Sequence, residues 1–183
     1  RLLLTIFLLT CAGINSADSG SIGGFRLAPI FGEHMVVQQR KPVVFYGTSN
    51  RNDKISIRFG TQQQQMTTPF NGHWKITLNP VPAGGPYSLQ IWVNDTLKVD
   101  WKDVLSGEVW LCSGQSNMAF ELKYAENGSA DALSANDFRL RLFNYKGFVQ
   151  TNDVEFDPPA LDRINRLDYF EGKWELNAPE TAA

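Results

Sequence analysis

The stretch that decides the fold reads EVWLCSGQSNM and spans residues 108–118. Its first part, residues 108–112, is a mostly apolar run, as is typical of a buried parallel strand. A glycine turn follows at Gly114, and residues 119–124 have a composition compatible with a helix. A strand, a sharp turn and a helix in this order place the turn at the carboxyl edge of an open α/β sheet, where ligands bind. We therefore expect an α/β domain to open here.

A serine in such a turn is a candidate nucleophile. Ser116 follows the glycine turn, and backbone N–H groups at a helix start can stabilise a developing oxyanion. A serine attacks a carbonyl only when a base removes its proton. Ser113 and Ser116 are equally suited to cap the helix, since serine is common at that position. The local sequence is not a G-x-S-x-G elbow, so the residues alone leave both interpretations open.

The residues before this stretch alternate as strands do. Inward-facing apolar residues recur with a period of two, which is typical of half-buried strands. Asn71-Gly72 indicates a two-residue hairpin turn and residues 82–86 indicate a loop. Short strands at this spacing predict an antiparallel β-sandwich over residues 25–103, and the α/β part is expected over residues 104–183. The predicted strands cover residues 43–46, 55–59, 74–78 and 87–93.

Composition and charge exclude several classes of protein. The chain has 183 residues, and 43% of them are hydrophobic, which excludes a fully disordered or collagen-like protein. Seventeen Lys and Arg against nineteen Asp and Glu give a net charge of −2, so no basic surplus favours nucleic acid. The two histidines, His34 and His73, have no Cys, Asp or Glu at metal-ligand spacing. We expect no metal, no cofactor and no nucleic-acid partner.

The N-terminus has the features of a secretory signal peptide. Residues 1–17 combine one positive charge, an apolar run of about ten residues and a small-residue end. The run is too short to span a membrane, so no span is expected after cleavage, and the protein is expected to be secreted or lysosomal. Asn94-Asp95-Thr96 and Asn127-Gly128-Ser129 match the N-glycosylation acceptor pattern, which makes Asn94 and Asn127 candidate glycosylation sites.

Residues 107–118 resemble the nucleophile block of the sialate O-acetylesterase family, within the SGNH (GDSL-like) hydrolase superfamily. Residues 27–39 are similar to the opening strand region of that family, and residues 83–87 are similar to a loop of it. The resemblance covers roughly residues 25–183. It implies an N-terminal antiparallel β-sandwich followed by the beginning of an α/β (SGNH-type, flavodoxin-like) hydrolase domain. It also implies the removal of O-acetyl groups from sialic acids, with an O-acetylated sialoglycoconjugate or a related acetylated sugar as the partner.

The resemblance assigns roles within the block. Ser116 would attack the acetyl carbonyl, and its own backbone N–H would contribute to the oxyanion hole. Gln115 and Asn117 would shape the loop, although both are also ordinary turn residues. Cys11 leaves with the signal peptide. Many relatives carry a cysteine where this chain has Asn177-Ala178. We therefore expect Cys112 to be a buried free thiol.

The resemblance also implies a catalytic base that does not follow Ser116 in this sequence. A serine esterase needs a histidine base, usually oriented by an acid, and no histidine follows Ser116. We expect the chain to be an N-terminal fragment of an esterase, inactive by itself. Two other interpretations stay open. One is a non-catalytic carbohydrate-binding sandwich with Trp74, Trp92 and Trp101 as stacking platforms, Trp92 being the best surface candidate. The other is an acetyl esterase acting on another polysaccharide.

Overall fold

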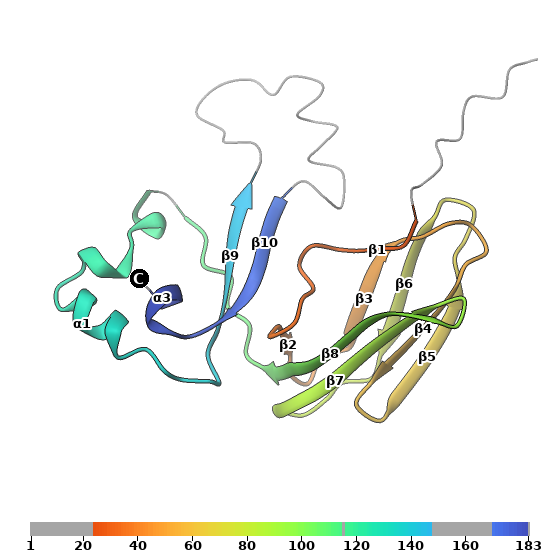
Figure 1. Cartoon of the computed structure of the whole chain (residues 1–183), viewed down its shortest axis with the longest axis horizontal. Coiled ribbons are helices and arrows are strands. Elements are labelled where there is room, and N and C mark those ends of the chain that lie inside the picture. Colours follow the sequence, from red (N-terminus) through yellow and green to blue (C-terminus); the bar gives the residue numbers. More distant parts are fainter. Residues whose placement is uncertain (1–23, 115, 148–169, 183) are drawn as a thin grey trace, which may run out of the picture.

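Strands dominate the structure, a computed structural model that describes residues 24–114, 116–147 and 170–182 (Figure 1). Residues 24–107 form short strands joined by turns, as the alternating apolar pattern predicts. The strands in this part are β1 (Arg26–Leu27), β2 (Val36–Gln38), β3 (Val43–Thr48), β4 (Lys54–Phe59), β5 (Gln62–Thr67), β6 (His73–Leu78), β7 (Gly84–Val93) and β8 (Thr96–Gly107).

These strands build two sheets. One sheet has the order β1-β3-β6, and the other has the order β2-β8-β7-β4-β5. In the larger sheet β4 pairs antiparallel with both β5 and β7, while β2 pairs parallel with β8. The larger sheet is therefore mixed. Its parallel pair joins β2, near the start of the described chain, to the last residues of β8.

The two sheets share one hydrophobic core. On β4 the inward residues Ile55, Ile57 and Phe59 are fully buried, in the alternation that the sequence predicts. Phe45 on β3 packs against Phe59 with ring centroids 5.9 Å apart, which joins the two sheets. Trp74 on β6 is 1% exposed, and its indole N–H donates to the Thr48 carbonyl oxygen at 3.1 Å. The core thus satisfies the polar atom of its largest side chain.

The Asn71-Gly72 turn does not close a hairpin, contrary to the sequence-based prediction. Gly72 has the expected positive φ of 71°, and the Asn71 side-chain oxygen accepts a hydrogen bond from the His73 N–H at 3.1 Å. However, the flanking strands β5 and β6 lie in different sheets, and β6 pairs with β3. Local turn chemistry fixes the reversal of the chain, whereas burial of the apolar faces decides which strands pair.

The Gly-rich segment around residues 82–86 is a loop only in its first part. β7 begins at Gly84, which pairs with Ser106 on β8. Gly84 and Gly85 have φ angles of 137° and 134°, which a side chain would strain. A Cβ atom at Gly85 would also lie 2.9 Å from the Val104 carbonyl oxygen. Glycine therefore lets β7 approach β8 closely at its start.

The residues after β8 form short helices and one strand pair. The helical turns are η1 (Ser116–Ala119), η2 (Leu122–Tyr124), α1 (Gly128–Leu133) and α3 (Pro179–Ala182). The strands β9 (Arg141–Gly147) and β10 (Phe170–Leu176) pair antiparallel with each other. Figure 1 shows this pair between the two sheets and the small helices.

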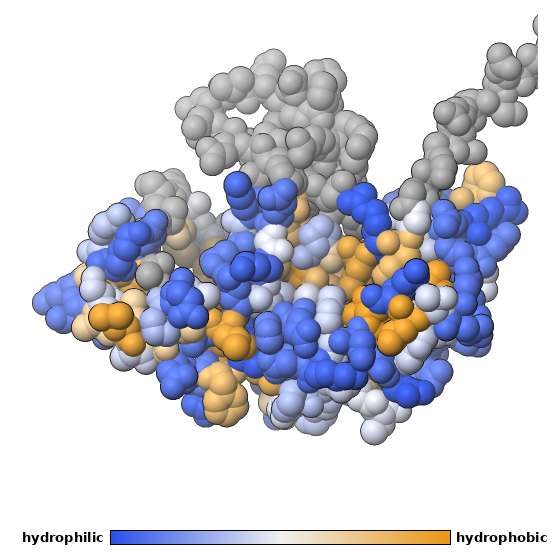
Figure 2. All heavy atoms as spheres, in the orientation of Figure 1, coloured by the Kyte–Doolittle hydropathy of each residue, from blue (hydrophilic) through white to orange (hydrophobic). Residues whose placement is uncertain are grey.

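Residues 108–112 do not form the predicted buried strand. They have no regular secondary structure, and Trp110 and Leu111 are 84% and 93% exposed. Cys112 is likewise exposed, so the prediction of a buried thiol is wrong for this structure. A strand needs at least one neighbouring strand to pair with, and a buried parallel strand is also covered on both faces. Among the described residues β9 and β10 pair with each other, and no strand pairs with residues 108–112. In Figure 2 small apolar patches lie on the α1 side, and the largest apolar area of this face lies over the two sheets.

The β9–β10 pair packs against the two sheets. Trp174 on β10 contacts the edge of the shared core, and its indole N–H donates to the Ile30 carbonyl oxygen at 2.7 Å. Phe143 on β9 lies against the Trp174 ring, with centroids 5.3 Å apart. This contact joins residues that are far apart in the sequence and positions the part of the chain that follows the serine block.

Only the sheet-rich character of the expected fold is thus confirmed, and the described part has a mixed curled sheet and few helices. The sandwich as a whole stays a prediction, and the pairing of β2 with β8 is parallel rather than antiparallel. The division into residues 25–103 and 104–183, and the α/β nature of the second part, stay predictions. The signal-peptide prediction for residues 1–17 falls outside the described residues. No helix within them has the length and apolarity to cross a membrane.

Candidate active site

The candidate nucleophile lies at the start of a helical turn. Ser116 is the first residue of η1, directly after the exposed segment that leaves β8. Asn117 is the second residue of the same turn and is exposed, and its carbonyl oxygen accepts the Phe120 N–H at 3.3 Å. Gln115, the third predicted site residue, lies outside the described residues. Ser116 therefore begins a helical turn, whereas residues 108–112 before it do not form the predicted strand.

Gly114 allows a tight turn before the serine. A Cβ atom at this position would lie 2.6 Å from Cγ of Met118. That distance is shorter than carbon atoms tolerate, so the Met118 side chain would have to move. Glycine at position 114 thus lets the last residue of the SGQSNM segment fold back over the first part of the turn.

Two glutamines, Gln38 at the end of β2 and Gln39 directly after it, bind the segment that leads into the serine block. The side-chain amides of Gln38 and Gln39 donate to the Glu108 carboxylate at 3.0 and 2.6 Å. The Gln38 side-chain oxygen also accepts the Val109 N–H at 3.0 Å. These hydrogen bonds, from Gln38 first and then Gln39, lower the pKa of Glu108. The two segments that carry the family resemblance, residues 27–39 and 107–118, therefore meet at the end of β8.

The histidines lie in the sheet-rich part of the chain. His73 is exposed at the start of β6. His34 adopts a left-handed conformation with φ of 68°, and its Nδ1 atom lies 2.6 Å from the Asp103 carboxylate. Sequence reasoning missed this pair because the two residues are 69 positions apart. No local pattern could have revealed it.

Asp103 has a second partner that decides its role. Nη2 of Arg141 lies 3.1 and 3.0 Å from the two Asp103 carboxylate oxygens. Burial raises the pKa of Asp103, but the His34 hydrogen bond and the Arg141 charge outweigh it and lower that pKa. The carboxylate thus stays ionised and binds a cation on β9. The His34–Asp103–Arg141 cluster is a joint between β8 and β9.

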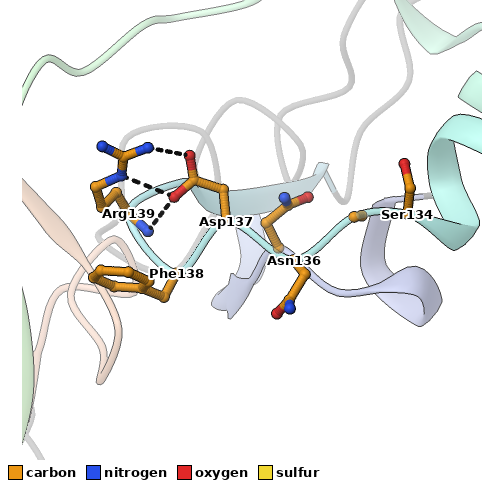
Figure 3. Close-up of a pocket in the computed structure, with 7 residues that line it drawn as sticks. Ser134, Asn136, Asp137, Phe138 and Arg139 are labelled. Carbon is orange, nitrogen blue, oxygen red and sulfur yellow. Dashed lines mark hydrogen bonds and ion pairs between the residues drawn. The ribbon is translucent and has the colours of Figure 1, made fainter.

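One hollow is lined entirely by residues outside the serine block. It has a volume of about 550 Å³ and is formed mainly by the loop between α1 and β9 (Figure 3). Asp137 in this loop is bound by Arg139, whose Nε and Nη2 atoms each lie 3.0 Å from a carboxylate oxygen. The Ser134 hydroxyl donates to the Asp131 carbonyl oxygen at 2.9 Å. These polar groups form hydrogen bonds and an ion pair with one another, so they are not free to bind a substrate. We therefore do not take this hollow as the candidate active site.

The two candidate glycosylation sites are both exposed. Asn94 lies in the turn between β7 and β8, where its side-chain nitrogen donates to Asp53 at 2.7 Å and its oxygen accepts the Lys54 N–H at 2.9 Å. Asn127 precedes α1 in a left-handed conformation, and its side chain makes no capping hydrogen bond. Each position is a surface turn, as the sequence predicts.

The three tryptophans considered as sugar platforms lie in different places. Trp74 is in the core, as the alternation of β6 predicts. Trp101 is partly buried and packs against the core cluster. Trp92 is half-buried on the outer face of the larger sheet, where the Arg58 guanidinium lies 5.5 Å from its ring centroid. Trp92 is therefore the one of the three that can offer a surface ring.

Several curated proteins similar to this sequence are named sialate O-acetylesterase. A human (Homo sapiens) protein named sialate O-acetylesterase is 35% identical over 159 residues, which cover 80% of this chain. The predicted resemblance to sialate O-acetylesterases is confirmed. The mouse (Mus musculus) sialate O-acetylesterase is 34% identical over 153 residues, or 76% of this chain. The chain spans 30% and 28% of the length of these two relatives. No family model matches the sequence.

A solved structure extends the likeness to three dimensions. The crystal structure of a carbohydrate acetylesterase from Xanthomonas citri is similar with a TM-score of 0.69 and 28% sequence identity. The match covers 86% of this chain and 33% of that chain. The relatives and the structural neighbour are all named as carboxylic ester hydrolases that act on acetyl groups.

Proposed function

We propose that this chain supplies the nucleophile of an esterase that removes acetyl groups from acetylated sugars. The observation that carries the proposal is the contact between the two resembling segments, where Gln38 and Gln39 hold Glu108 at the entrance to the serine block. The names of the relatives support the reaction class. Ser116 attacks the acetyl carbonyl while a base takes its proton, and the sugar oxygen leaves with that proton as the serine ester forms. Water then hydrolyses this ester, which releases acetate and restores the serine.

The substrate we propose is an O-acetylated sialic acid. The human and mouse relatives are named for sialate, whereas the bacterial neighbour is named only for carbohydrate. An acetyl ester on another polysaccharide is the alternative, since the serine block contacts the acetyl group rather than the sugar. Comparing hydrolysis of 9-O-acetylated sialic acid with that of an acetylated xylan fragment separates the two.

The fold we propose is a β-sandwich, antiparallel except for the pairing of β2 with β8, followed by the opening of an SGNH-type α/β domain. The base is expected outside residues 1–183, because the two histidines lie on β6 and in the turn before β2. A polypeptide of residues 1–183 alone should therefore hydrolyse p-nitrophenyl acetate no faster than its Ser116→Ala variant. Turnover that Ser116→Ala abolishes would contradict the expected inactivity of this polypeptide.

A chimera tests the nucleophile itself. The residues of human sialate O-acetylesterase that match this chain are replaced by the sequence of this chain, so that the remainder of the human protein completes the site. We expect hydrolysis of O-acetylated sialic acid, and a loss of about 10³-fold or more in kcat for Ser116→Ala. Ser113→Ala is the matched control. Ser116→Asp separates catalysis from capping, because aspartate caps helices as well as serine does.

We also propose that the protein enters the secretory pathway and carries glycans at Asn94 and Asn127. Both asparagines lie in exposed turns, which suits a glycan. Intact mass before and after enzymatic removal of N-glycans, for protein secreted by a eukaryotic cell line, measures both sites. Asn94→Gln and Asn127→Gln should each remove one glycan, and unchanged masses would contradict the proposal.

A further inference from the structure

The outer face of the larger sheet contains a shallow polar hollow that the proposed esterase site does not use. Its centre is Ser56 on β4, which pairs with Gln65 on β5 and with Trp92 on β7. Lys54 and Arg58 lie two residues before and after Ser56, and therefore on the same face. The hollow has a volume of about 250 Å³, and its lining residues are Lys54, Ser56, Arg58, Gln63, Gln65, Trp92 and Asp95.

The depth of this hollow follows from side-chain size. Ser56 is only 9% exposed although it points away from the core, because the larger residues around it rise above it. Ile55 and Ile57, its neighbours along β4, face inward and are fully buried. Because Ser56 is small and its neighbours are long, the sheet surface is depressed at position 56. A large residue at this position would fill the depression.

The walls combine cations, amides and an aromatic ring. The Arg58 guanidinium lies 5.5 Å from the Trp92 ring centroid and 3.5 Å from the Gln63 side-chain oxygen. Lys54 pairs with Asp95 at 3.3 Å. Asp95 is the one carboxylate among the lining residues, against the two cations Lys54 and Arg58. The contact with Trp92 holds the guanidinium over the ring, since cations are attracted to the face of an indole. The hollow therefore carries an excess of positive charge beside a flat apolar surface.

This combination fits a sugar ring that carries an acid group. A pyranose has apolar C–H faces that pack on an aromatic ring, and hydroxyl groups that bond to amides such as Gln63 and Gln65. An anionic substituent matches the guanidinium of Arg58 and the ammonium of Lys54. An apolar peptide would find few apolar partners here, because Trp92 is the only large apolar side chain among the lining residues.

We propose that this face of β4, β5 and β7 is an acidic-sugar binding site, separate from the serine block. The strand order places it at the opposite side of the sheet from β2, whose Gln38 holds the entrance to the serine block. A site of this kind holds an acidic glycan on the protein without taking part in ester hydrolysis. It goes beyond the proposed function and does not require Ser116.

Nuclear magnetic resonance titration of the full chain tests the site directly. The Ser116→Ala variant is used, so that hydrolysis and binding are measured separately. The probes are the methyl α-glycoside of N-acetylneuraminic acid, galactose 6-sulfate and the neutral methyl galactoside. We expect the sialic acid glycoside, with or without galactose 6-sulfate, to shift the resonances of the Trp92 indole N–H and of the Ser56 and Gln65 amides. Salt should weaken this binding, because exposed charges are screened.

Variants then assign the binding to the hollow. Arg58→Gln and Trp92→Ala should each raise the Kd at least 10-fold, while Lys75→Gln on β6 should leave it unchanged. Ser56→Gln fills the floor and keeps the charges, so it should also abolish binding. Thermal unfolding of each variant verifies that it folds. Equal binding of the neutral probe, shifts located elsewhere, or no shift at 20 mM sugar, a concentration chosen for weak exposed sites, would each overturn the proposal.

Discussion

Arg141 on β9 and Asp103 on β8 form an ion pair that joins the two parts of the chain, with Nη2 of Arg141 3.1 and 3.0 Å from the two carboxylate oxygens. The Arg141 side chain is only 3% exposed, and its Nε and Nη1 atoms have no hydrogen-bond partner among the described residues. A buried guanidinium is costly unless a carboxylate compensates it. Asp103 is thus the residue on which the position of β9 depends.

Asp103→Ala should lower the free energy of unfolding by about 2–3 kcal/mol, because it leaves the Arg141 charge buried without its carboxylate. The value lies at the low end of the range for buried pairs, since Asp103 is itself 29% exposed. Urea denaturation followed by tryptophan fluorescence measures it, with Trp174 reporting on the junction.

Asp137→Ala is the matched control for this prediction. Asp137 binds Arg139 within one exposed loop, and exposed pairs contribute about 0–1 kcal/mol. Equal losses for the two variants would show that the Asp103 pair has no special role at the junction.

Stability should depend on pH through the same carboxylate. The pKa of Asp103 is lower in the folded protein than in the unfolded chain, where it is about 3.9. The stabilisation is therefore complete above that unfolded value and is lost as the pH falls through the lower folded value. The difference in unfolding free energy between wild type and Asp103→Asn should shrink as the pH falls below 4. A difference that grows on acidification has the wrong sign for this account.

The contact between Gln38 and residues 108–109 should matter for activity more than for stability. Gln38→Leu keeps the side-chain size but removes the hydrogen bonds to Glu108 and Val109. We expect about a 10-fold lower kcat in the chimera, as a displaced site loses alignment, with a stability change below about 1 kcal/mol because the contacts are exposed. Gln64→Leu on β5 is the control, and equal kinetics for both variants would refute the positioning role.

A variant of Trp110 tests whether residues 108–112 form a buried strand. Because its side chain is 84% exposed, Trp110→Ser in the chain of residues 1–183 should change the unfolding free energy by no more than about 0.5 kcal/mol. Trp74→Ala in the core should instead cost about 3–5 kcal/mol. Urea denaturation compares them, and a loss of several kcal/mol for Trp110→Ser would restore the buried strand.

The sequence predicts those features that depend on residues close together in the chain. Alternation identified β4, because Ile55, Ile57 and Phe59 must all face the core. It could not reveal the His34–Asp103 pair or the meeting of Gln38 with Glu108, since these contacts join residues about 70 positions apart and depend on the parallel pairing of β2 with β8.

The apolar run at residues 108–112 was predicted to be a strand, but the structure has no strand there. Its composition suits a buried strand, but a strand also needs partners, and composition does not name them. Asn71-Gly72 likewise indicated a turn correctly without showing that the next strand joins the other sheet. Burial of whole faces decides these pairings, and that is a property of the complete fold.

Covalent labelling of the chimera tests the central claim, that Ser116 is the nucleophile. A fluorophosphonate reacts with a serine that a neighbouring base activates, with fluoride as the leaving group. Mass spectrometry of the digested protein should find the phosphonyl adduct on the peptide that contains Ser116, in wild type and in Ser113→Ala, and not in Ser116→Ala. An adduct on another serine, with hydrolysis of O-acetylated sialic acid retained in Ser116→Ala, would contradict the account.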